Sequence, residues 1–197
     1  MVAGIAIEPY TTGHEDAVVT LLARAFATNP IHVAAFGDHA MARNDVFFRV
    51  GVALLRGPKI VAVERDRVVG FNHWVDYPGC IVAPRDRMRV TPVLMKGLGL
   101  RAARRTVQWV GAWADSHPSI PHVHLGPLGV EPAEQGRGIG TLLMERHIED
   151  LDRRRVPGYL ETDRPGNVVF YERFGFRLVR EVGALGVTNF FMWRAAS

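Results

Sequence analysis

The chain has very little cysteine, since Cys80 is the only one among its 197 residues. One cysteine excludes a disulfide framework within the chain, which is typical of proteins in reducing compartments. Long hydrophobic runs are missing too, because no apolar stretch approaches the roughly 18 to 20 residues of a membrane-spanning helix. Residues 1–7 are too short for the apolar region of a signal peptide and lack a basic start. We therefore expect a cytoplasmic protein with no membrane partner.

An excess of one charge is also absent. Lysine and arginine number 24 and aspartate and glutamate 20, which leaves a formal charge of +4. Nucleic-acid-binding proteins usually concentrate positive charge on one face, whereas the arginine clusters at residues 101–105 and 153–155 are typical of solvated helix ends. We expect no nucleic-acid partner. The absence of repeats, low-complexity tracts and long linkers predicts one domain over residues 1–197.

The sequence also lacks the residue spacing that is typical of metal ligands. Eight histidines and the one cysteine are scattered along the chain without the close pairs that mark zinc sites. The sequence therefore predicts no metal cofactor.

What is present is a pattern of short strands and amphipathic helices, with a hydrophobic fraction of 48% that suits a folded core. Strands are predicted near residues 5–7 and at 60–64, 68–75, 122–130, 157–162, 176–181 and 187–193, and helices at 12–27, 38–56, 136–155 and 168–174. Residues 85–116 are mostly helical in pattern, with breaks near Thr91-Pro92 and Gly97–Gly99. Glycine and proline inside 122–130 indicate a bulge or a splayed strand. This order predicts an α/β fold with a mixed sheet.

The segment from Gln135 to Thr141 is a glycine-rich turn between a predicted strand and a predicted helix. The first backbone amides of a helix have no internal partner and carry the positive end of its dipole, so they bind anions such as phosphate. Glycines let phosphate oxygens approach the backbone, and Arg137 adds a mobile cation. A helix start without a ligand is the simplest alternative. A Walker loop is excluded because Gly-Lys-Ser/Thr is missing, and the spacing fits a Rossmann fingerprint poorly.

The pattern Gln135-x-x-Gly138-x-Gly140 resembles motif A of the GNAT superfamily of N-acetyltransferases. The preceding residues, 128–132, look like the end of that family's fourth strand. The run from Asn167 to Phe176 resembles its second signature, an asparagine followed by Tyr-Glu-Arg-x-Gly-Phe. These motifs cover residues 122 to about 194, and within the superfamily they look closest to puromycin-type acetyltransferases. The resemblance implies a mostly antiparallel central sheet splayed between strands 4 and 5 and flanked by helices, with a helical insertion at about 84–116.

The resemblance also implies acetyl-CoA as co-substrate, with no metal. Motif A would hold the pyrophosphate, the end of strand 4 would pair with the pantetheine arm, and the second signature would contact the rest of the cofactor. The implied cofactor-binding residues are Leu128, Gly129, Val130, Gln135, Gly136, Arg137, Gly138, Ile139, Gly140, Thr141, Asn167, Phe170, Tyr171 and Arg173. A plain helix cap is the alternative role for Asn167.

Catalytic roles follow from the same resemblance. Tyr171 matches the family's general acid, which protonates the departing thiolate; its alternative is a core tyrosine. The Val130 amide is the implied oxyanion donor. Some family members carry a glutamate base where this chain has His124, so a histidine base is expected there, with Glu161 as a second candidate. Surface histidines without a role are the alternative.

The predicted function is transfer of the acetyl group from acetyl-CoA directly to a primary amine of a small molecule. An acetyltransferase for a protein or peptide amine is one alternative, and a CoA-binding regulatory module without turnover is another. The insertion at 84–116 would cover the acceptor site, or serve as a packing or dimer element. A homodimer is therefore one of the possible assemblies.

Overall fold

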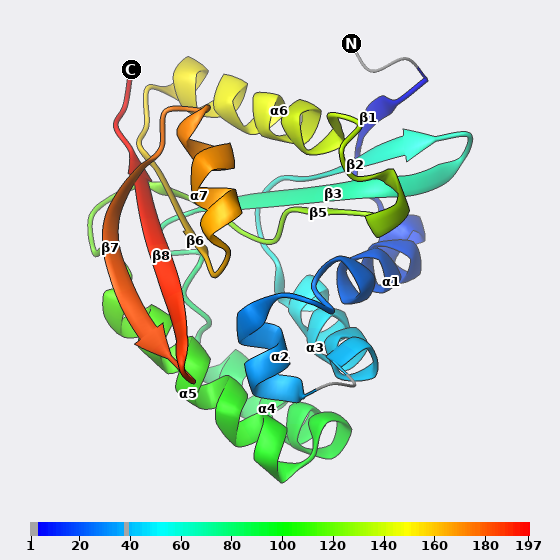
Figure 1. Ribbon diagram of the computed structural model, residues 1–197, viewed down its shortest axis with the longest axis vertical. Coiled ribbons are helices and arrows are strands. Elements are labelled where there is room, and N and C mark those ends of the chain that lie inside the picture. Colours follow the sequence, from blue (N-terminus) through cyan, green and yellow to red (C-terminus); the bar gives the residue numbers. More distant parts are fainter. Residues whose placement is uncertain (1–3, 38–39) are drawn as a thin grey trace.

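The computed structural model describes residues 4–37 and 40–197, and it confirms the expected α/β fold with an open, mostly antiparallel sheet (Figure 1). The strands are β1 (Ala6–Pro9), β2 (Lys59–Glu64), β3 (Arg67–Asp76), β4 (Val123–Leu125), β5 (Gly129–Val130), β6 (Gly158–Thr162), β7 (Arg177–Ala184) and β8 (Val187–Arg194). They pair in the order β1-β2-β3-β4-β6-β8-β7, and β5 pairs with β3 beside β4. Only β4 and β6 run parallel among these described strands.

The helices flank this sheet. They are α1 (Glu15–Ala25), α2 (Pro30–Phe36), α3 (Ala40–Leu54), α4 (Pro84–Leu98), α5 (Leu100–Ser116), α6 (Ile139–Arg154) and α7 (Pro165–Glu172), with single 3₁₀ turns at Thr12–His14 and Pro132–Glu134. Among the described residues, no single helix has the length and hydropathy of a membrane span. One bent pair, Thr12–Ala25 with Pro30–Phe36 at 95°, reaches that length and composition only when its two parts are taken together.

The core lies on both faces of β2 and β3. Val61 and Phe71 face each other across these strands and pack with Val18 and Leu22 of α1. The next position along, Ala62, packs on the other face with residues of α6 such as Leu143. Because side chains alternate across a strand, two neighbouring positions attach one helix to each face.

The expected single strand at 122–130 is broken into β4 and β5, as its glycines and proline indicate. Both halves pair with β3, but only β4 also pairs with β6, at Val123 and His124. Pro127, inside the break, has no N–H to donate to a ladder. The sheet therefore opens between β5 and β6, which confirms the predicted splay.

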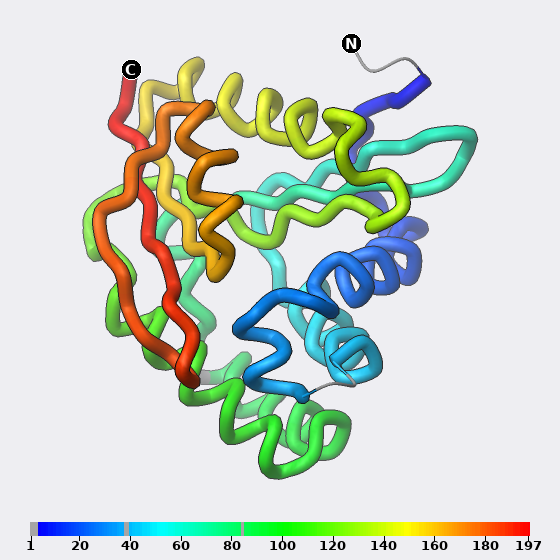
Figure 2. Tube along the Cα trace, in the orientation of Figure 1, coloured from blue at the N-terminus to red at the C-terminus, as the bar shows by residue number. Residues whose placement is uncertain are grey.

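The insertion is one helical hairpin, α4 and α5, at the lower end of the view in Figure 2 beside the turn between β7 and β8. The expected break near Gly97–Gly99 is confirmed, because α4 ends at Leu98 and the chain turns at Gly99, whereas the break expected near Thr91-Pro92 is wrong, because α4 continues through it. Pro92 removes a single intrahelical hydrogen bond. Gly97 serves close packing, since a Cβ there would lie 2.5 Å from Cγ1 of Val46 on α3.

Two further differences concern the first half of the chain. Helix α2 was not expected, although Pro30 stands at its first position and Asn29 precedes it, which is a common helix start. The helix expected from residue 38 is described from Ala40 to Leu54, and positions 38 and 39 lie outside the described residues.

Candidate functional site

The glycine-rich turn has the backbone of an anion site. Gly136 and Gly138 adopt φ of 79° and 84°, a left-handed conformation that suits glycine. The first hydrogen bond into α6 runs from the Leu142 amide to the Gly138 carbonyl at 3.1 Å. The amides of Ile139, Gly140 and Thr141 precede that bond, so they stay available for a ligand at the positive end of the helix.

Arg137 differs from the expected mobile cation. Its guanidinium donates to both oxygens of Glu64, at 2.7 and 3.1 Å, and to Glu134. These hydrogen bonds raise the pKa of Arg137. The side chain therefore ties the turn to the end of β2, and it does not line the cavity described below.

The end of the broken strand presents a backbone amide away from the sheet. Glu131 donates to the Val69 carbonyl at 3.0 Å, and Val130 lies opposite Gly70, one position along. Because hydrogen-bonded pairs alternate in an antiparallel ladder, the N–H and C=O of Val130 point away from β3. Its carbonyl accepts from Gln135 Nε2 at 3.1 Å. The Val130 amide is thus oriented as an oxyanion donor would need.

Helix α7 brings Asn167 and Tyr171 to the same opening. The Asn167 side chain donates to Thr162 Oγ1 at 3.0 Å, at the end of β6. Asn167 is not the helix cap, because Arg164 occupies that position. Tyr171, only 7% exposed, lies in the core cluster yet also lines the cavity. Burial and the nearby Asp163 carboxylate raise the pKa of Tyr171, so its hydroxyl stays protonated.

The two candidate bases form one pair. His124 on β4 and Glu161 on β6 lie on neighbouring parallel strands, and His124 Nε2 is 2.7 Å from Glu161 Oε2. Burial lowers the pKa of His124, but the Glu161 carboxylate and the Cys80 thiol more than offset this and raise it to about 10. That value is close to the pKa of an aliphatic amine, about 10.4. His124 is therefore protonated at neutral pH, and it can accept a proton from an amine of similar pKa only after it has lost its own.

A single cavity of about 810 Å³ joins these groups. Its lining includes the glycine-rich turn before α6, then His124, Glu161 and Tyr171 from β4, β6 and α7, and aromatic residues of the helices in the first half of the chain and of α5. The aromatic end is lined by Phe26, Phe47, Phe48, His32, Trp109 and Trp113. All predicted cofactor-binding residues except Arg137 line this cavity.

The aromatic end consists of α1, α2, α3 and α5, so the insertion covers the cavity through Trp109 and Trp113. Two other aromatic residues, Phe36 and Trp74, lie in the core, 1% and 5% exposed, and do not line this cavity. Asp163, directly after β6, accepts from the Ile31 amide at 2.7 Å and from Asn29 Nδ2 at 3.2 Å. This buried carboxylate fixes the start of α2 at the cavity wall.

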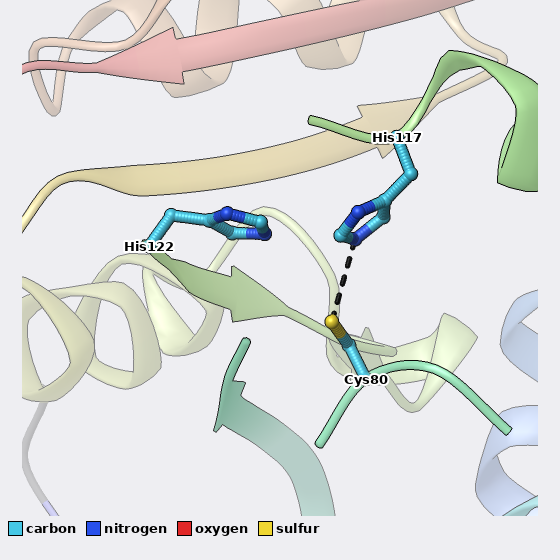
Figure 3. Close-up of side chains that lie close together, drawn as sticks. All are labelled: Cys80, His117 and His122. Carbon is cyan, nitrogen blue, oxygen red and sulfur yellow. Dashed lines mark hydrogen bonds between the residues drawn. The ribbon is translucent and has the colours of Figure 1, made fainter. Parts of the chain in front are cut away.

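One cluster beside the cavity was not among the residues predicted from the sequence. Cys80, His117 and His122 lie together (Figure 3), with Cys80 Sγ 3.4 Å from His117 Nε2. Burial raises the pKa of Cys80, but the neighbouring imidazoles of His117, His122 and His124 more than offset this and lower it to about 5. The spacing of His117 and His122, with four residues between them, falls within the range of zinc ligands. Cys80 comes far earlier in the chain, so only the fold brings the three together.

Comparison with known proteins shows what the chain resembles. Residues 98–178 match the family model described as an acetyltransferase (GNAT) domain. A mycothiol acetyltransferase of Mycobacteroides abscessus is 34% identical over 98 residues, which are 46% of this chain and 32% of that protein. The chain therefore spans about a third of the length of the curated relatives it matches.

Solved structures agree in fold. A structure described as a histone acetyltransferase HPA2 and related acetyltransferase from Corynebacterium glutamicum has a TM-score of 0.73 at 21% identity, covering 98% of this chain and 97% of that one. A GNAT family acetyltransferase from Brucella melitensis, solved with acetyl-CoA, has a TM-score of 0.53 at 17% identity, covering 97% of this chain and 87% of that one. Together, these findings support a GNAT acetyltransferase domain in this chain.

The matched part of the GNAT domain contains the glycine-rich turn, His124, Glu161 and Tyr171. Cys80 and the helices α1, α2 and α3 of the aromatic end precede it. The family model therefore covers the part of the cavity wall around the glycine-rich turn and leaves most of the aromatic end outside.

Proposed function

We propose that this protein transfers the acetyl group of acetyl-CoA to a primary amine of a small molecule. The observation that carries the proposal is the single cavity that leads from the glycine-rich turn, past Tyr171, His124 and Glu161, to an aromatic chamber. Such a cavity can hold both substrates at once, which a direct transfer needs. Support also comes from the GNAT domain and from a neighbouring fold solved with acetyl-CoA.

In this proposal the free amides at the start of α6 bind the pyrophosphate of acetyl-CoA. The outward-pointing backbone of Val130 and the side chain of Asn167 bind the pantetheine arm. Phe170 packs beside the turn, with its ring 3.6 Å from where a Cβ of Gly140 would stand, and Arg173 lies over that ring. Both residues therefore belong to the cofactor-binding wall, together with Leu128 and Gly129.

The proton steps use the two groups in the middle of the cavity. The His124–Glu161 pair, with His124 neutral, accepts the proton that the amine loses. The amine nitrogen then attacks the thioester carbon, and the Val130 amide stabilises the oxyanion. When the carbon–sulfur bond breaks, the sulfur takes its proton from the Tyr171 hydroxyl, which burial keeps protonated. The attacking nitrogen gives its second proton to the Tyr171 oxygen, which restores the phenol and leaves a neutral amide. His124 then releases the first proton to solvent.

The acceptor end favours an amine with a flat or apolar body. Phe47 and Trp109 stack at 5.4 Å between centroids, and Trp113 meets Trp109 edge-on at 5.3 Å. Glu161 and Asp163 supply carboxylates on the same wall. Aromatic rings hold an apolar body and attract cations, while carboxylates hold the charged nitrogen before it loses its proton.

A panel of acceptors tests the proposal. The purified protein is incubated with acetyl-CoA and aminoglycosides, puromycin-like nucleosides, polyamines, amino acids or peptides, and released CoA thiol is measured. We expect turnover with a small primary amine and none with its N-methylated or N-acetylated form. Turnover with peptides alone would favour the protein-amine alternative. Tight acetyl-CoA binding with no thiol release across the panel would favour a regulatory module. Direct determination of location and oligomeric state would test the cytoplasmic and homodimer predictions.

A further inference from the structure

The fold brings three loop residues to one place beside the cavity. Asp76 at the end of β3 pairs with Val123 at the start of β4, so the chain after β3 runs beside the chain before β4. The Tyr77 amide confirms this by donating to the His122 carbonyl at 2.9 Å. Cys80 follows on one side and His122 precedes β4 on the other. His117 comes directly after the end of α5.

Hydrogen bonds set which ring nitrogen of each histidine is free. His117 Nδ1 lies 3.0 Å from the Pro118 carbonyl, and His122 Nδ1 lies 2.7 Å from the Ile120 carbonyl. A carbonyl only accepts, so each Nδ1 carries the proton and each Nε2 carries a lone pair. Metal-binding histidines almost always use one ring nitrogen in this way, because the bond fixes the ring orientation.

Both free nitrogens are near the sulfur. His117 Nε2 lies 3.4 Å from Cys80 Sγ, and one ligand atom from each of the three residues lies within 4.8 Å of the others. Zinc bonds of about 2.3 Å to sulfur and about 2.0 to 2.1 Å to nitrogen, at tetrahedral angles, place the two ligand atoms about 3.6 Å apart. Figure 3 shows the two rings, from the segment between α5 and β4, and the cysteine, from the loop after β3, close to one another.

The Nε2 atom of the second histidine, His122, has no hydrogen-bonding role in the described structure. His122 is 4% exposed, and its Nε2 is buried without a hydrogen-bond partner among the described residues. Leaving such a nitrogen unpaired in the interior is unfavourable, because its hydrogen bond to water is lost and not replaced. A bound cation would remove that cost and would suit the cysteine as a thiolate.

We propose that Cys80, His117 and His122 bind one divalent transition-metal ion, for which Zn²⁺ fits the sulfur and imidazole donors best. A second set, His117, His124 and Glu161, shares His117. We assign His117 to the cysteine set because His124 Nε2 and Glu161 already bond each other at 2.7 Å. Three protein ligands leave one coordination position for water or substrate.

The ion would join the loop after β3 to the end of α5. Helix α5 carries Trp109 and Trp113, which line the acceptor end of the cavity. The metal would thus hold the acceptor wall in place, whereas the glycine-rich turn and α7 belong to other segments of the chain. Loss of the ion should therefore weaken acceptor binding and leave acetyl-CoA affinity unchanged.

Titration of tag-free protein with Co²⁺, after chelator treatment, tests the site directly. We expect one equivalent of cobalt with visible bands of a tetrahedral ion and a sulfur-to-cobalt charge-transfer band, displaced by Zn²⁺. Cys80→Ser should abolish the charge-transfer band, and His122→Gln should weaken binding by at least about tenfold. His14→Gln, on the remote turn before α1, is the matched control and should bind like the parent.

Failure of the parent protein to bind cobalt or zinc would overturn the proposal, and so would a charge-transfer band that survives Cys80→Ser. The titration of the parent protein decides whether the metal site exists, even if a variant does not fold. Calorimetry with acetyl-CoA shows whether each variant is folded. Because metal binding is measured without turnover, this result is independent of the acetyltransferase proposal.

Discussion

His124 and Glu161 come from adjacent parallel strands, and their side chains meet at 2.7 Å in the middle of the cavity. The Glu161 side chain is 3% exposed and that of His124 17%. A buried carboxylate next to a partly accessible imidazole holds the ring in one orientation and stabilises the imidazolium that proton uptake produces. The relationship turns two separate candidates into one functional unit.

Glu161→Gln should therefore lower turnover by about 100-fold, within the range for loss of acid–base assistance. The amide keeps the size of the carboxylate but not its charge, so acetyl-CoA affinity should stay unchanged. Steady-state kinetics and calorimetry measure both. Glu145→Gln, on the exposed side of α6, is the control. Full turnover in Glu161→Gln would show that the pair takes no part.

Tyr171→Phe should also reduce turnover by about 100-fold, because the leaving sulfur loses its proton donor. The ring stays in its core cluster, so stability and acetyl-CoA binding should change little. Single-turnover thiol release measures the effect, with Tyr10→Phe as the control. Unreduced turnover at every pH tested would remove the acid role from Tyr171.

Gly138→Val should weaken acetyl-CoA binding by at least about tenfold. Gly138 has φ of 84° at the cap of α6, which a β-branched residue adopts only with strain. The strain would move the free amides that bind phosphate. Calorimetry with CoA measures the loss, and Gly166→Val on α7, where a Cβ meets no atom within 4 Å, is the comparison. Equal affinities would contradict the phosphate-binding assignment.

Asp163→Ala should lower the free energy of unfolding by about 1–3 kcal/mol, because the Ile31 amide and the Asn29 side chain lose their acceptor. Helix α2 would then be less firmly held, so the Michaelis constant for the amine should rise more than that for acetyl-CoA. Denaturant unfolding and kinetics test this, with exposed Asp115→Ala as the control. Equal changes in both Michaelis constants would contradict a role confined to the acceptor end.

His147 should make the protein less stable in acid. It is 0% exposed, and burial lowers its pKa to about 3, against an unfolded value near 6.5. The unfolded state therefore takes up the proton first. Stability is complete above pH 6.5 and falls as the pH drops toward 3. The histidine contributes about 2 kcal/mol of this loss at pH 5.

His147→Leu should remove that part of the pH dependence. Thermal unfolding at pH 7.5 and pH 5, compared between parent and variant, measures the difference. His14→Leu, near the surface, should retain the parent's dependence. An unchanged slope in His147→Leu would show that His147 does not control acid stability.

The sequence located the glycine-rich turn of the cavity better than its aromatic wall, for a physical reason. The conformation of that turn depends on local backbone, and the glycine spacing from Gly136 to Gly140 indicates it within a few residues. The acceptor end depends on contacts between distant segments, such as Asp163 with Ile31, which no spacing reveals. A local signal also misled at Pro92, which lies inside α4 and does not end it.

The same division explains the histidines. His124 could be located by counting from motif A, whereas its bond to Glu161 required the parallel pairing of β4 and β6. His117 and His122 carry a usable spacing, but their cysteine lies on another loop. The position of each histidine in the chain could be read from the sequence, whereas its interaction partner could be identified only from the fold.

The continuity of the cavity has a kinetic consequence. If donor and acceptor share one volume, both must be bound before either product leaves, so double-reciprocal plots at varied amine concentration should intersect and not run parallel. A CoA thioester with a bulky acyl group would extend into the aromatic end and compete with the amine. The length of acyl chain at which that competition begins would measure the distance between the two binding positions.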